Sequence, residues 1–347
     1  MSIGAAAVNV VDKVVHGGVA DLTRMPRAAV IGSPDAILYR YLPVDGVHAL
    51  DAPPVLLIPP LGAPDFAYDL RRDCSLVEHL LTAGRTVFLV AYGRIGFADR
   101  RLGMEHWVDE VVPRAVRDTA KESGAASVDL LGWSLGGIFC LLAAAADPGL
   151  PLNTLTVIGS PVDIAAVPLV APLRPLAGLA GGHGLSTIYR AIGSFPGPLV
   201  SWAFQLTAVD RLVTKPLTVL SRLDDRDCLA QIEAVDHFMN HMLGYPGRVF
   251  GQIYHLLLRS NDLAEGTIDL AGRTIALADI DVPVLVVAGE NDVIAPLAAV
   301  ERLTGLLSGA PEVRFRSAPG GHLGVLTGRR ARTSTWTYVD RFLAGHT

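Results

Sequence analysis

The sequence predicts an α/β fold with a doubly wound, mostly parallel sheet and an inserted helical cap. Three observations support this prediction. Short apolar runs alternate with amphipathic stretches, in the order strand, helix, strand that a parallel sheet requires. A glycine-flanked serine stands between one apolar run and an Ala/Leu-rich stretch. Between residues 164 and 271 the β runs vanish, and short apolar helical pieces alternate with prolines and glycines.

This pattern divides the chain into three parts. Residues 31–163 and 272–347 are expected to form the core, and residues 164–271 are expected to be inserted as a cap. Such caps commonly select substrates and exclude water. Residues 1–30 form an N-terminal helical segment that we expect to be amphipathic and to pack on the domain. Its apolar positions are Val8, Val11, Val14, Val15 and Val19.

Each expected core element has a local signal. The strand runs are short, apolar and bounded by turn residues, whereas the helices show apolar periodicity. We expect strands over residues 36–42, 55–58, 87–91, 155–158, 283–288 and 313–317, and helices over 75–83, 104–122 and 297–307.

The most informative stretch runs from Val128 to Ala146: an apolar strand, a tight turn with Ser134 at its apex, and an apolar helix. A Gly-x-Ser-x-Gly turn holds its serine under backbone strain, and Gly132 and Gly136 let strand and helix pass closely. Such a turn points the backbone N–H of Leu135 and the start of the helix toward a reacting oxygen. We therefore expect Ser134 to be a nucleophile and Leu135 to supply half of an oxyanion hole.

The second oxyanion donor is expected in the loop after the strand at 55–58, which reads Pro59-Pro60-Leu61-Gly62. Pro60 has no N–H, so the donor is Leu61 or Gly62. For the substrate pocket we expect Trp133, beside the serine, and Asp163, which follows the strand after the elbow helix.

A serine hydroxyl needs a base within hydrogen-bond reach, and the base needs an acid that holds its tautomer. Asp292 comes directly after the strand at 283–288, and His322 lies in a glycine-flanked loop directly after the strand at 313–317. Carboxyl ends of strands are where open α/β sheets place their sites. We assign Asp292 as the orienting acid and His322 as the general base. Asp163 is the competing acid, with a helix cap as its other interpretation, and Glu290 is interpreted as solvated.

His237 and His241 are four residues apart and share a helical face, so they are candidates for a pair of metal ligands. No third ligand sits at a usual spacing, and we expect no metal and no cofactor. The three cysteines lie far apart without any Cys-x-x-Cys spacing, which indicates buried thiols in a reducing cytoplasm. They are Cys74, Cys140 and Cys228.

The composition of the chain limits the kinds of partner that the sequence predicts. The net charge is −5 over 347 residues and no long basic run occurs, which argues against nucleic acid. No apolar run approaches the roughly 18 residues that a bilayer span needs, and the N-terminus lacks a signal-peptide pattern, so we expect a cytoplasmic protein without a membrane span. A small-molecule substrate is therefore expected, and the apolar cap is a candidate face for a homodimer.

Taken together, these residues resemble the polyhydroxyalkanoate synthase branch of the α/β-hydrolase superfamily, over about residues 50 to 330. The matching stretches are Leu57-Ile58-Pro59-Pro60, Asp73-Cys74-Ser75-Leu76-Val77 with Leu80 and Leu81, Gly132 to Gly137, Gly159-Ser160-Pro161-Val162-Asp163, Ile268-Asp269-Leu270 through Pro283-Val284-Leu285, and Gly321-His322. The resemblance implies an α/β-hydrolase fold and a Cys-Asp-His triad, whose positions fall on Ser134, Asp292 and His322.

Two departures from that family bear on the chemistry. The family's nucleophile is a cysteine, where this chain has Ser134, and its aspartate is followed by a histidine, where this chain has Val293. A synthase passes an acyl group from coenzyme A through an enzyme thioester to an alcohol. A serine forms an oxoester, which is less activated toward a second alcohol, so water becomes a plausible acceptor.

We therefore expect a serine hydrolase, an esterase or thioesterase that cleaves acyl esters or acyl-CoA thioesters, hydroxyacyl ones included. The alternative is a synthase-like acyltransferase that moves a hydroxyacyl group from coenzyme A to an alcohol or polyester. A third hypothesis is a non-catalytic binding protein that has kept the fold.

Overall fold

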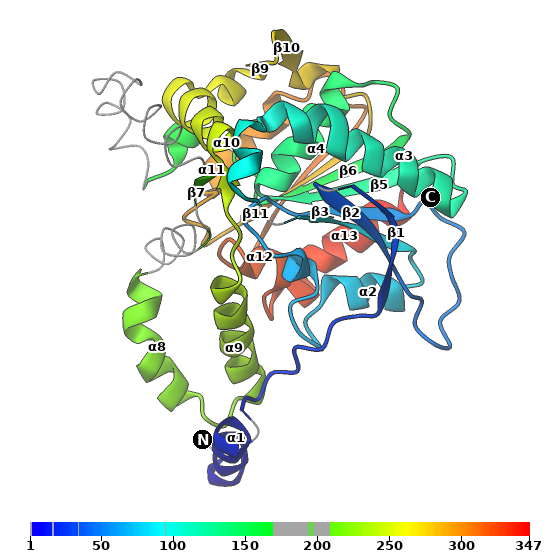
Figure 1. Cartoon of the computed structure of the whole chain (residues 1–347). Coiled ribbons are helices and arrows are strands. Elements are labelled where there is room, and N and C mark those ends of the chain that lie inside the picture. The colour runs from blue at the N-terminus through cyan, green and yellow to red at the C-terminus, as the bar shows by residue number, and fades with distance from the viewer. Residues whose placement is uncertain are drawn as a thin grey trace.

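The computed structural model describes residues 2–15, 17–33, 35–93, 95–168, 194–195, 197 and 209–347. Residues 169–193, 196 and 198–208, which belong to the expected cap segment, lie outside the described residues. The core has three layers, a central sheet with helices on both faces (Figure 1).

The central sheet has eight strands in the order β1-β2-β4-β3-β5-β6-β11-β12. Their bounds are β1 Arg27–Gly32, β2 Ala36–Tyr41, β3 Val55–Ile58, β4 Val87–Tyr92, β5 Val128–Trp133, β6 Leu152–Ile158, β11 Val284–Gly289 and β12 Val313–Ala318. The pairs β1–β2 and β2–β4 are antiparallel, and the other pairs in this sheet are parallel. The predicted mostly parallel sheet is confirmed, although β1 was not among the expected strands.

Strand β3 shows why the sheet needs helices on both faces. Leu56 and Ile58 belong to the core cluster that includes α3 (Val112–Ser123) and α4 (Leu135–Ala146). Val55 and Leu57 belong to the cluster that includes α2 (Leu76–Thr82) and α13 (Thr335–Ala344). Side chains of a strand alternate between the two faces, so a strand that is apolar throughout is stable only when both faces are covered. Figure 1 shows α3 and α4 on one side of the sheet and α2 and α13 on the other.

Two expected helices differ in detail from the prediction. The helix expected over residues 104–122 begins with π-helical turns, His106–Val111, before α3 starts. Pro113 lies in the first turn of α3 and has no N–H to donate to the preceding turn, which accounts for the irregular turns there. The helix expected over 297–307 is α11 (Leu297–Glu301), which continues as a 3-10 helix over Arg302–Gly305.

Several described elements lie in the inserted segment. They are α8 (Val209–Ser221), α9 (Arg226–Asn240), the short strands β7 (Ser194–Phe195) and β8 (Tyr245–Pro246), α10 (Gly247–Gln252) and the π-helix Ile253–Ser260. The expectation that β runs vanish in this segment is wrong, because β9 (Thr267–Leu270) forms a hairpin with β10 (Arg273–Ala276). Ala271 and Gly272 have φ values of 51° and 81°, which suit a turn between twisted strands. The hairpin therefore crosses the boundary expected at residues 271–272.

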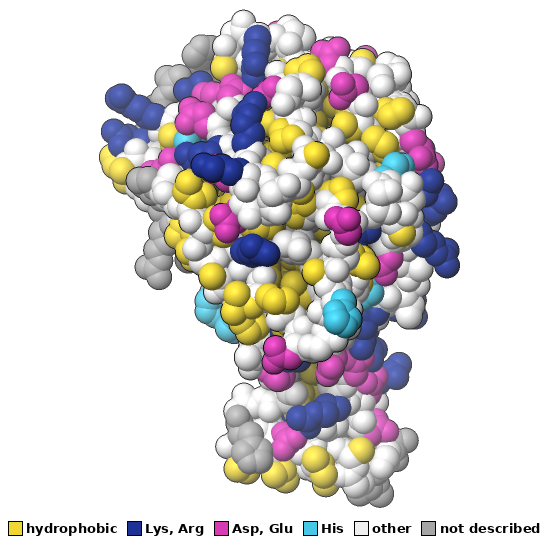
Figure 2. Space-filling view, turned by 90° about the vertical axis from the view of Figure 1, so that its right-hand side faces the viewer, with side chains coloured by type: hydrophobic (Ala, Val, Ile, Leu, Met, Phe, Trp, Pro, Cys, Tyr) yellow, Lys and Arg dark blue, Asp and Glu magenta, His cyan; other side chains and the backbone are white. Residues whose placement is uncertain are grey.

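The N-terminal helix α1 (Ile3–Val15) lies beside α8 and α9, at one end of the molecule (Figure 1). Polar contacts join it to this region: the Asn9 amide donates to the Leu223 carbonyl at 2.8 Å, and Lys13 pairs with Glu233 at 3.0 Å. The apolar stripe faces outward, and hydrophobic atoms line the underside of the small lower lobe in Figure 2. The valines that are more than half exposed are Val8, Val11, Val14 and Val15. The spacing of the apolar residues therefore predicted the helix correctly, but these apolar residues are not the face that packs against the rest of the chain.

In the part of the chain that is described, no helix is both long enough and apolar enough to cross a bilayer.

Candidate active site

Ser134 occupies the turn between β5 and α4, with φ 54° and ψ −126°. A positive φ is uncommon for a residue with a side chain and indicates backbone strain. The Ser134 N–H donates to the Ile158 carbonyl at 2.9 Å, and the Ser134 carbonyl accepts from the Ile138 N–H at 3.2 Å. These two hydrogen bonds hold the strained turn between the neighbouring strand and the helix.

Glycines around this turn are required by close backbone packing. A Cβ atom on Gly136 would lie less than 3 Å from backbone atoms of Ile58 and Pro59 at the end of β3. A Cβ atom on Gly132 would lie 2.6 Å from the Cα of Gly137. Backbone atoms cannot rotate away as a flexible side chain can, so any larger residue would push the elbow out of place.

Three side chains that are distant in sequence meet at the carboxyl ends of the parallel strands. His322 Nε2 lies 2.8 Å from Ser134 Oγ, and His322 Nδ1 lies 2.8 Å from Asp292 Oδ2. The other carboxylate oxygen, Asp292 Oδ1, accepts from the N–H groups of Ile294 and Ala295 at 2.9 and 2.8 Å. The carboxylate is thereby fixed, and it can hold the imidazole with Nδ1 protonated, so that Nε2 is the atom that accepts the serine proton.

Trp133 supports the imidazole from behind. Its indole N–H donates to the His322 carbonyl at 3.1 Å, and the two ring centroids are 5.2 Å apart. Trp133 is only 2% exposed, so it fixes the position of His322 and presents little surface to a substrate. On the other side of the turn, the Ser160 hydroxyl donates to the Ser134 carbonyl at 2.8 Å. Ser160 therefore holds the nucleophile's own peptide group.

One of the expected oxyanion donors, Gly62, lies against a tyrosine. Leu135 begins α4 directly after Ser134, and Leu61 and Gly62 follow β3. The Tyr245 hydroxyl would be 2.6 Å from a Cβ atom on Gly62. Burial raises the pKa of Tyr245 to about 12, and a hydrogen bond with the Gly62 backbone acts in the opposite direction. The hydroxyl of Tyr245 thus lies against the backbone of Gly62.

The competing acid Asp163 is not brought to the imidazole. Its carboxylate accepts from the Ala165 N–H at 3.0 Å and from the Asn261 amide at 2.9 Å, so it caps the short helix that follows β6. Glu290 is exposed, and its carboxylate lies 3.4 Å from the Ser317 hydroxyl. This agrees with the interpretation of Glu290 as a solvated residue.

His237 and His241 on α9 form an aromatic cluster with Phe66. The two imidazole centroids are 4.2 Å apart, and the Phe66 ring lies within 6 Å of both. Burial, followed by the charges of His241 and Arg24, lowers the pKa of His237. Among the described residues, no group of three or more histidine, cysteine or acidic side chains could hold a metal ion.

The helix α9 is tied to the core by ion pairs near its start and by an aromatic contact near its end. Asp227 pairs with Arg71 at 2.6 Å and with Arg332 at 2.7 Å, and Gln231 accepts from Arg71 at 3.1 Å. Further along the helix, Phe238 packs edge-on against Trp133 with 6.1 Å between ring centroids. The inserted segment therefore reaches the tryptophan that supports His322.

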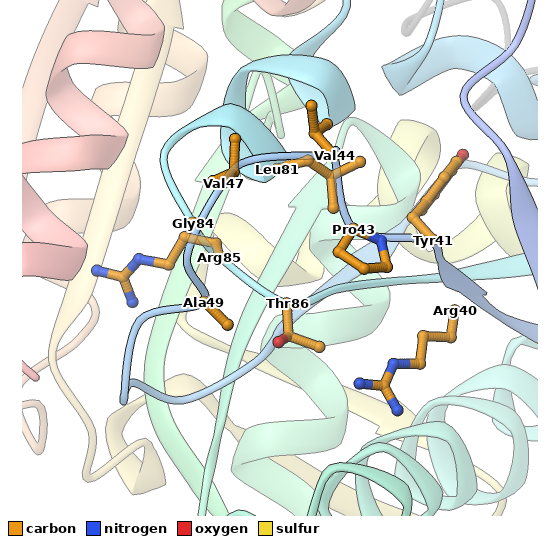
Figure 3. Close-up of a pocket in the computed structure, with 10 residues that line it drawn as sticks. All are labelled: Arg40, Tyr41, Pro43, Val44, Val47, Ala49, Leu81, Gly84, Arg85 and Thr86. Atoms are coloured by element: carbon orange, nitrogen blue, oxygen red, sulfur yellow. The ribbon is translucent and has the colours of Figure 1, made fainter.

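Two cavities lie away from the three side chains. The smaller, of about 110 Å³, is bounded by the end of β2, the loop after it and the residues before β4 (Figure 3). Thr86 in its wall precedes the amino end of β4, whereas Ser134 follows the carboxyl end of β5, so this cavity opens at the opposite edge of the sheet. The larger, of about 730 Å³, is bounded by α10, the 3-10 helix Phe97–Arg101 and the β9 strand.

Reasoning from the sequence missed Ser160 and Tyr245. Ser160 had a usable signal, because it follows the carboxyl end of β6, next to the strand that carries the nucleophile. Tyr245 had none, because its contact with Gly62 joins segments that are far apart in the chain.

No protein-family model matches the chain. Among curated proteins, the PhaC subunit of the poly(3-hydroxyalkanoate) polymerase of Allochromatium vinosum is 26% identical over 319 residues, which cover 92% of this chain and 88% of that protein. The PhaC subunit of Thiocystis violacea is 24% identical with the same coverage. The PhaC subunit of Haloferax mediterranei is 23% identical over 84% of this chain and 58% of its own length. The resemblance to polyhydroxyalkanoate synthases is thereby confirmed along most of the chain.

Solved structures show the same fold. Alpha/beta hydrolase domain-containing protein 10 from mouse superposes with a TM-score of 0.52 at 15% identity, over 93% of this chain and all of that one. The monoacylglycerol lipase of Paleococcus ferrophilus gives 0.50 at 17% identity, over 85% and 97% of the two chains. The chain is an enzyme with the α/β-hydrolase fold.

Proposed function

We propose that this enzyme is a serine esterase or thioesterase that cleaves acyl esters or acyl-CoA thioesters. Ser134 is the nucleophile, His322 the general base and Asp292 the acid that orients it. One observation carries the proposal: an unbroken pair of 2.8 Å hydrogen bonds joins the Ser134 hydroxyl to His322 and His322 to Asp292. A serine with a base in hydrogen-bond contact, and a base with a fixed carboxylate, is the arrangement that acyl transfer needs.

The reaction follows in two halves. Ser134 Oγ bonds to the acyl carbon as its proton passes to His322 Nε2, and the negative oxygen is held by the Leu135 N–H with Leu61 or Gly62. The bond to the leaving group then breaks, and that group takes the proton from His322. Water next attacks the acyl-serine, giving its proton to His322, and Ser134 recovers that proton as the carboxylic acid departs.

Acyl transfer is the second candidate function, in which an alcohol or a growing polyester replaces water. The PhaC relatives favour it, because they are named as polymerase subunits. Ser134 favours hydrolysis, because the resemblance implies a cysteine at this position and an oxoester is less activated than a thioester toward an alcohol.

We further propose that residues 164–271 cover the site as a cap and that residues 31–163 and 272–347 form the catalytic core. The contacts of Phe238 with Trp133 and of Tyr245 with Gly62 support this assignment. The first reaches from the inserted segment to the residue before Ser134, and the second reaches to the loop after β3. A cover of this kind excludes water until the acyl-enzyme has formed.

The test mixes the purified enzyme with 3-hydroxybutyryl-CoA and follows thiol release, free acid and oligomer. Release of thiol with an equal amount of free acid supports hydrolysis, and oligomer supports transfer. Ser134→Ala is expected to lose both activities and labelling by a fluorophosphonate probe. Ser123→Ala is the matched control, because that serine lies at the end of α3 before the amino end of β5.

Ser134→Cys separates the two candidate functions further. If the oxoester makes water the acceptor, the cysteine variant is expected to form more oligomer and less free acid than the wild type. A wild-type enzyme that releases no thiol, hydrolyses no ester and fails to react with the probe would overturn both candidates and favour a binding protein.

A further inference from the structure

Tyr68 is a fully buried tyrosine whose hydroxyl reaches the backbone at the end of β3. It is the last residue of the short 3-10 helix Asp65–Tyr68, and its exposed fraction is 0%. Its hydroxyl donates to the Ile58 carbonyl at 2.8 Å. Ile58 is the last residue of β3, so this hydrogen bond joins the two ends of the segment from residue 58 to residue 68. That segment contains Leu61 and Gly62, the proposed oxyanion donors.

The same hydroxyl lies next to the strand that carries the nucleophile. Burial raises the pKa of Tyr68 well above its usual value, and a hydrogen bond with the Trp133 backbone acts in the opposite direction. A hydroxyl has one proton to donate and lone pairs that accept, so it can accept from the Trp133 N–H while it donates to Ile58. Trp133 is the last residue of β5 and directly precedes Ser134. Tyr68 therefore contacts the backbone of two neighbouring strands where both of them end.

The Ile58 carbonyl that Tyr68 holds is packed against the first turn of α4. A Cβ atom on Gly136 would lie less than 3 Å from this carbonyl oxygen and from the backbone of Pro59. Ile58 also pairs with Gly132 in the register of β3 and β5. Helix α4 lies against both strands (Figure 1). The end of β3 is therefore enclosed by the elbow on one side and by the Tyr68 hydroxyl on another.

The loop that begins after β3 cannot be held at its start by its own backbone donors. Its first two residues are Pro59 and Pro60, and a proline has no N–H. Further along the loop, the Gly62 carbonyl accepts from the Leu243 N–H at 2.9 Å, a contact with the inserted segment. The Tyr68 hydroxyl therefore holds this loop at its start, where neither proline can donate.

We propose that Tyr68 is a positioning residue for the oxyanion hole. Its hydroxyl keeps the end of β3 and the end of β5 at a fixed separation, and it thereby places the N–H groups of Leu61 and Gly62 relative to Ser134. Donors of an oxyanion hole are effective because they are in place before charge develops, and a displacement of about 1 Å can lower a rate about a hundredfold. This inference rests on the proposed acyl-transfer function, and it adds a residue that acts through the backbone of others.

The first test uses Tyr68→Phe, which removes the hydroxyl and keeps the ring that fills the core. In the hydrolysis of a p-nitrophenyl ester, kcat is expected to fall about ten- to a hundredfold. The pH profile of kcat/KM is expected to stay that of the wild type, because His322 and Asp292 keep their hydrogen bond. Tyr338→Phe is the matched control, since this tyrosine of α13 packs against the same apolar cluster as Tyr68. Its kcat is expected to stay within about twofold of wild type.

A pair of ligands separates the oxyanion hole from the rest of the site. When a trifluoromethyl ketone binds, Ser134 Oγ bonds to the carbonyl carbon, the serine proton passes to His322, and the carbonyl oxygen becomes the negative oxygen that the hole holds. The corresponding secondary alcohol cannot form this adduct. Tyr68→Phe is expected to reduce the preference for the ketone over the alcohol at least about tenfold. Partial unfolding would weaken both ligands alike and leave this preference unchanged.

Three results would overturn the proposal. The first is a kcat and a ligand preference that both stay within about twofold of wild type. The second is a lower kcat with an unchanged preference, which would mark Tyr68 as a residue that supports the fold alone. The third is a shifted pH profile, which would place the effect in the three catalytic side chains.

The proposed function fails separately, if the wild type neither hydrolyses an ester nor prefers the ketone to the alcohol. Hydrogen exchange of the Leu61 and Gly62 amides then tests the role of Tyr68 without any activity. Faster exchange in Tyr68→Phe than in the wild type supports the positioning of this loop by the hydroxyl, and equal exchange overturns it.

Discussion

Tyr245 lies so close to Gly62 that only a glycine fits there. A Cβ atom at position 62 would be 2.6 Å from the tyrosine hydroxyl and 2.7 to 2.8 Å from two of its ring carbons. One residue belongs to the inserted segment and the other to the loop that follows β3. This contact therefore couples the proposed cap to a proposed oxyanion donor.

Gly62→Ala is expected to lower kcat/KM at least about tenfold, because the new methyl group displaces Tyr245 and moves the loop that holds the oxyanion. Tyr245→Ala in the same chain is expected to restore part of the loss, since it removes the clashing ring. Ester hydrolysis by the two single variants and the double variant measures this coupling, which we expect to be about 1 to 3 kcal/mol. Additive losses would show that the contact does not matter for catalysis.

Asp292→Asn is expected to keep the fold and lower kcat roughly 10⁴-fold, because an amide can donate to His322 Nδ1 and so favours the wrong tautomer. The comparison is Asp163→Asn, whose carboxylate caps a short helix and does not reach the imidazole. Steady-state kinetics with a p-nitrophenyl ester checks the difference. A larger loss in the Asp163 variant than in the Asp292 variant would reverse the assignment of the acid.

Gly136→Ala is expected to destabilise the protein by about 3 kcal/mol, because its methyl group would press against the backbone of Ile58 and Pro59. Gly305→Ala is the matched control, since a Cβ atom there meets nothing within 4 Å. The control is expected to change stability by less than about 1 kcal/mol. Urea unfolding of both variants provides the measurement, and equal midpoints would contradict the close approach of β3 to α4.

Asp227→Asn is expected to lower the free energy of unfolding by about 1 kcal/mol at pH 7, because Asp227 is partly exposed and solvent screens its pairs with Arg71 and Arg332. Burial acts to raise the pKa of Asp227, but the hydrogen bond and charge of Arg71, with the charges of Arg332 and Arg329, lower it overall.

A lowered pKa in the folded state means that the stabilisation is present above the unfolded pKa of about 3.9 and is lost as the pH falls through the folded value. The difference in stability between wild type and Asp227→Asn is therefore expected to shrink in that acidic range. Asp147→Asn, on a surface pair with Arg117, is the control. A difference that stays constant down to pH 2 would show that this carboxylate is not stabilised by its arginines.

Much of the candidate site was predictable because it depends on short-range features. The apolar run before Ser134, the glycines on either side of it and the positions of Asp292 and His322 after two strands are all visible in local sequence. Parallel strands bring their carboxyl ends to one edge, so loops that follow several strands converge without further information. The hairpin β9–β10 was missed even though its alternation of exposed and buried residues is local, because the segment around it is rich in turn residues.

The remaining features depend on pairs of residues that are remote in the chain. Three such features are set by how whole elements pack: the contact of Tyr245 with Gly62, the hydrogen bond from Trp133 to His322, and the outward-facing valines of α1. The periodicity of apolar residues shows which face of an element is apolar, but it does not show which other element packs against it. Hydrophobic spacing and the absence of a Cβ atom at glycine act within a few residues. Amino-acid order was therefore enough to predict the central-sheet strands other than β1, the elbow, and the candidate residues Ser134, Asp292 and His322 in their chain order. Only the packed fold determined which side chains support them, because that choice depends on distances between segments that no local pattern encodes.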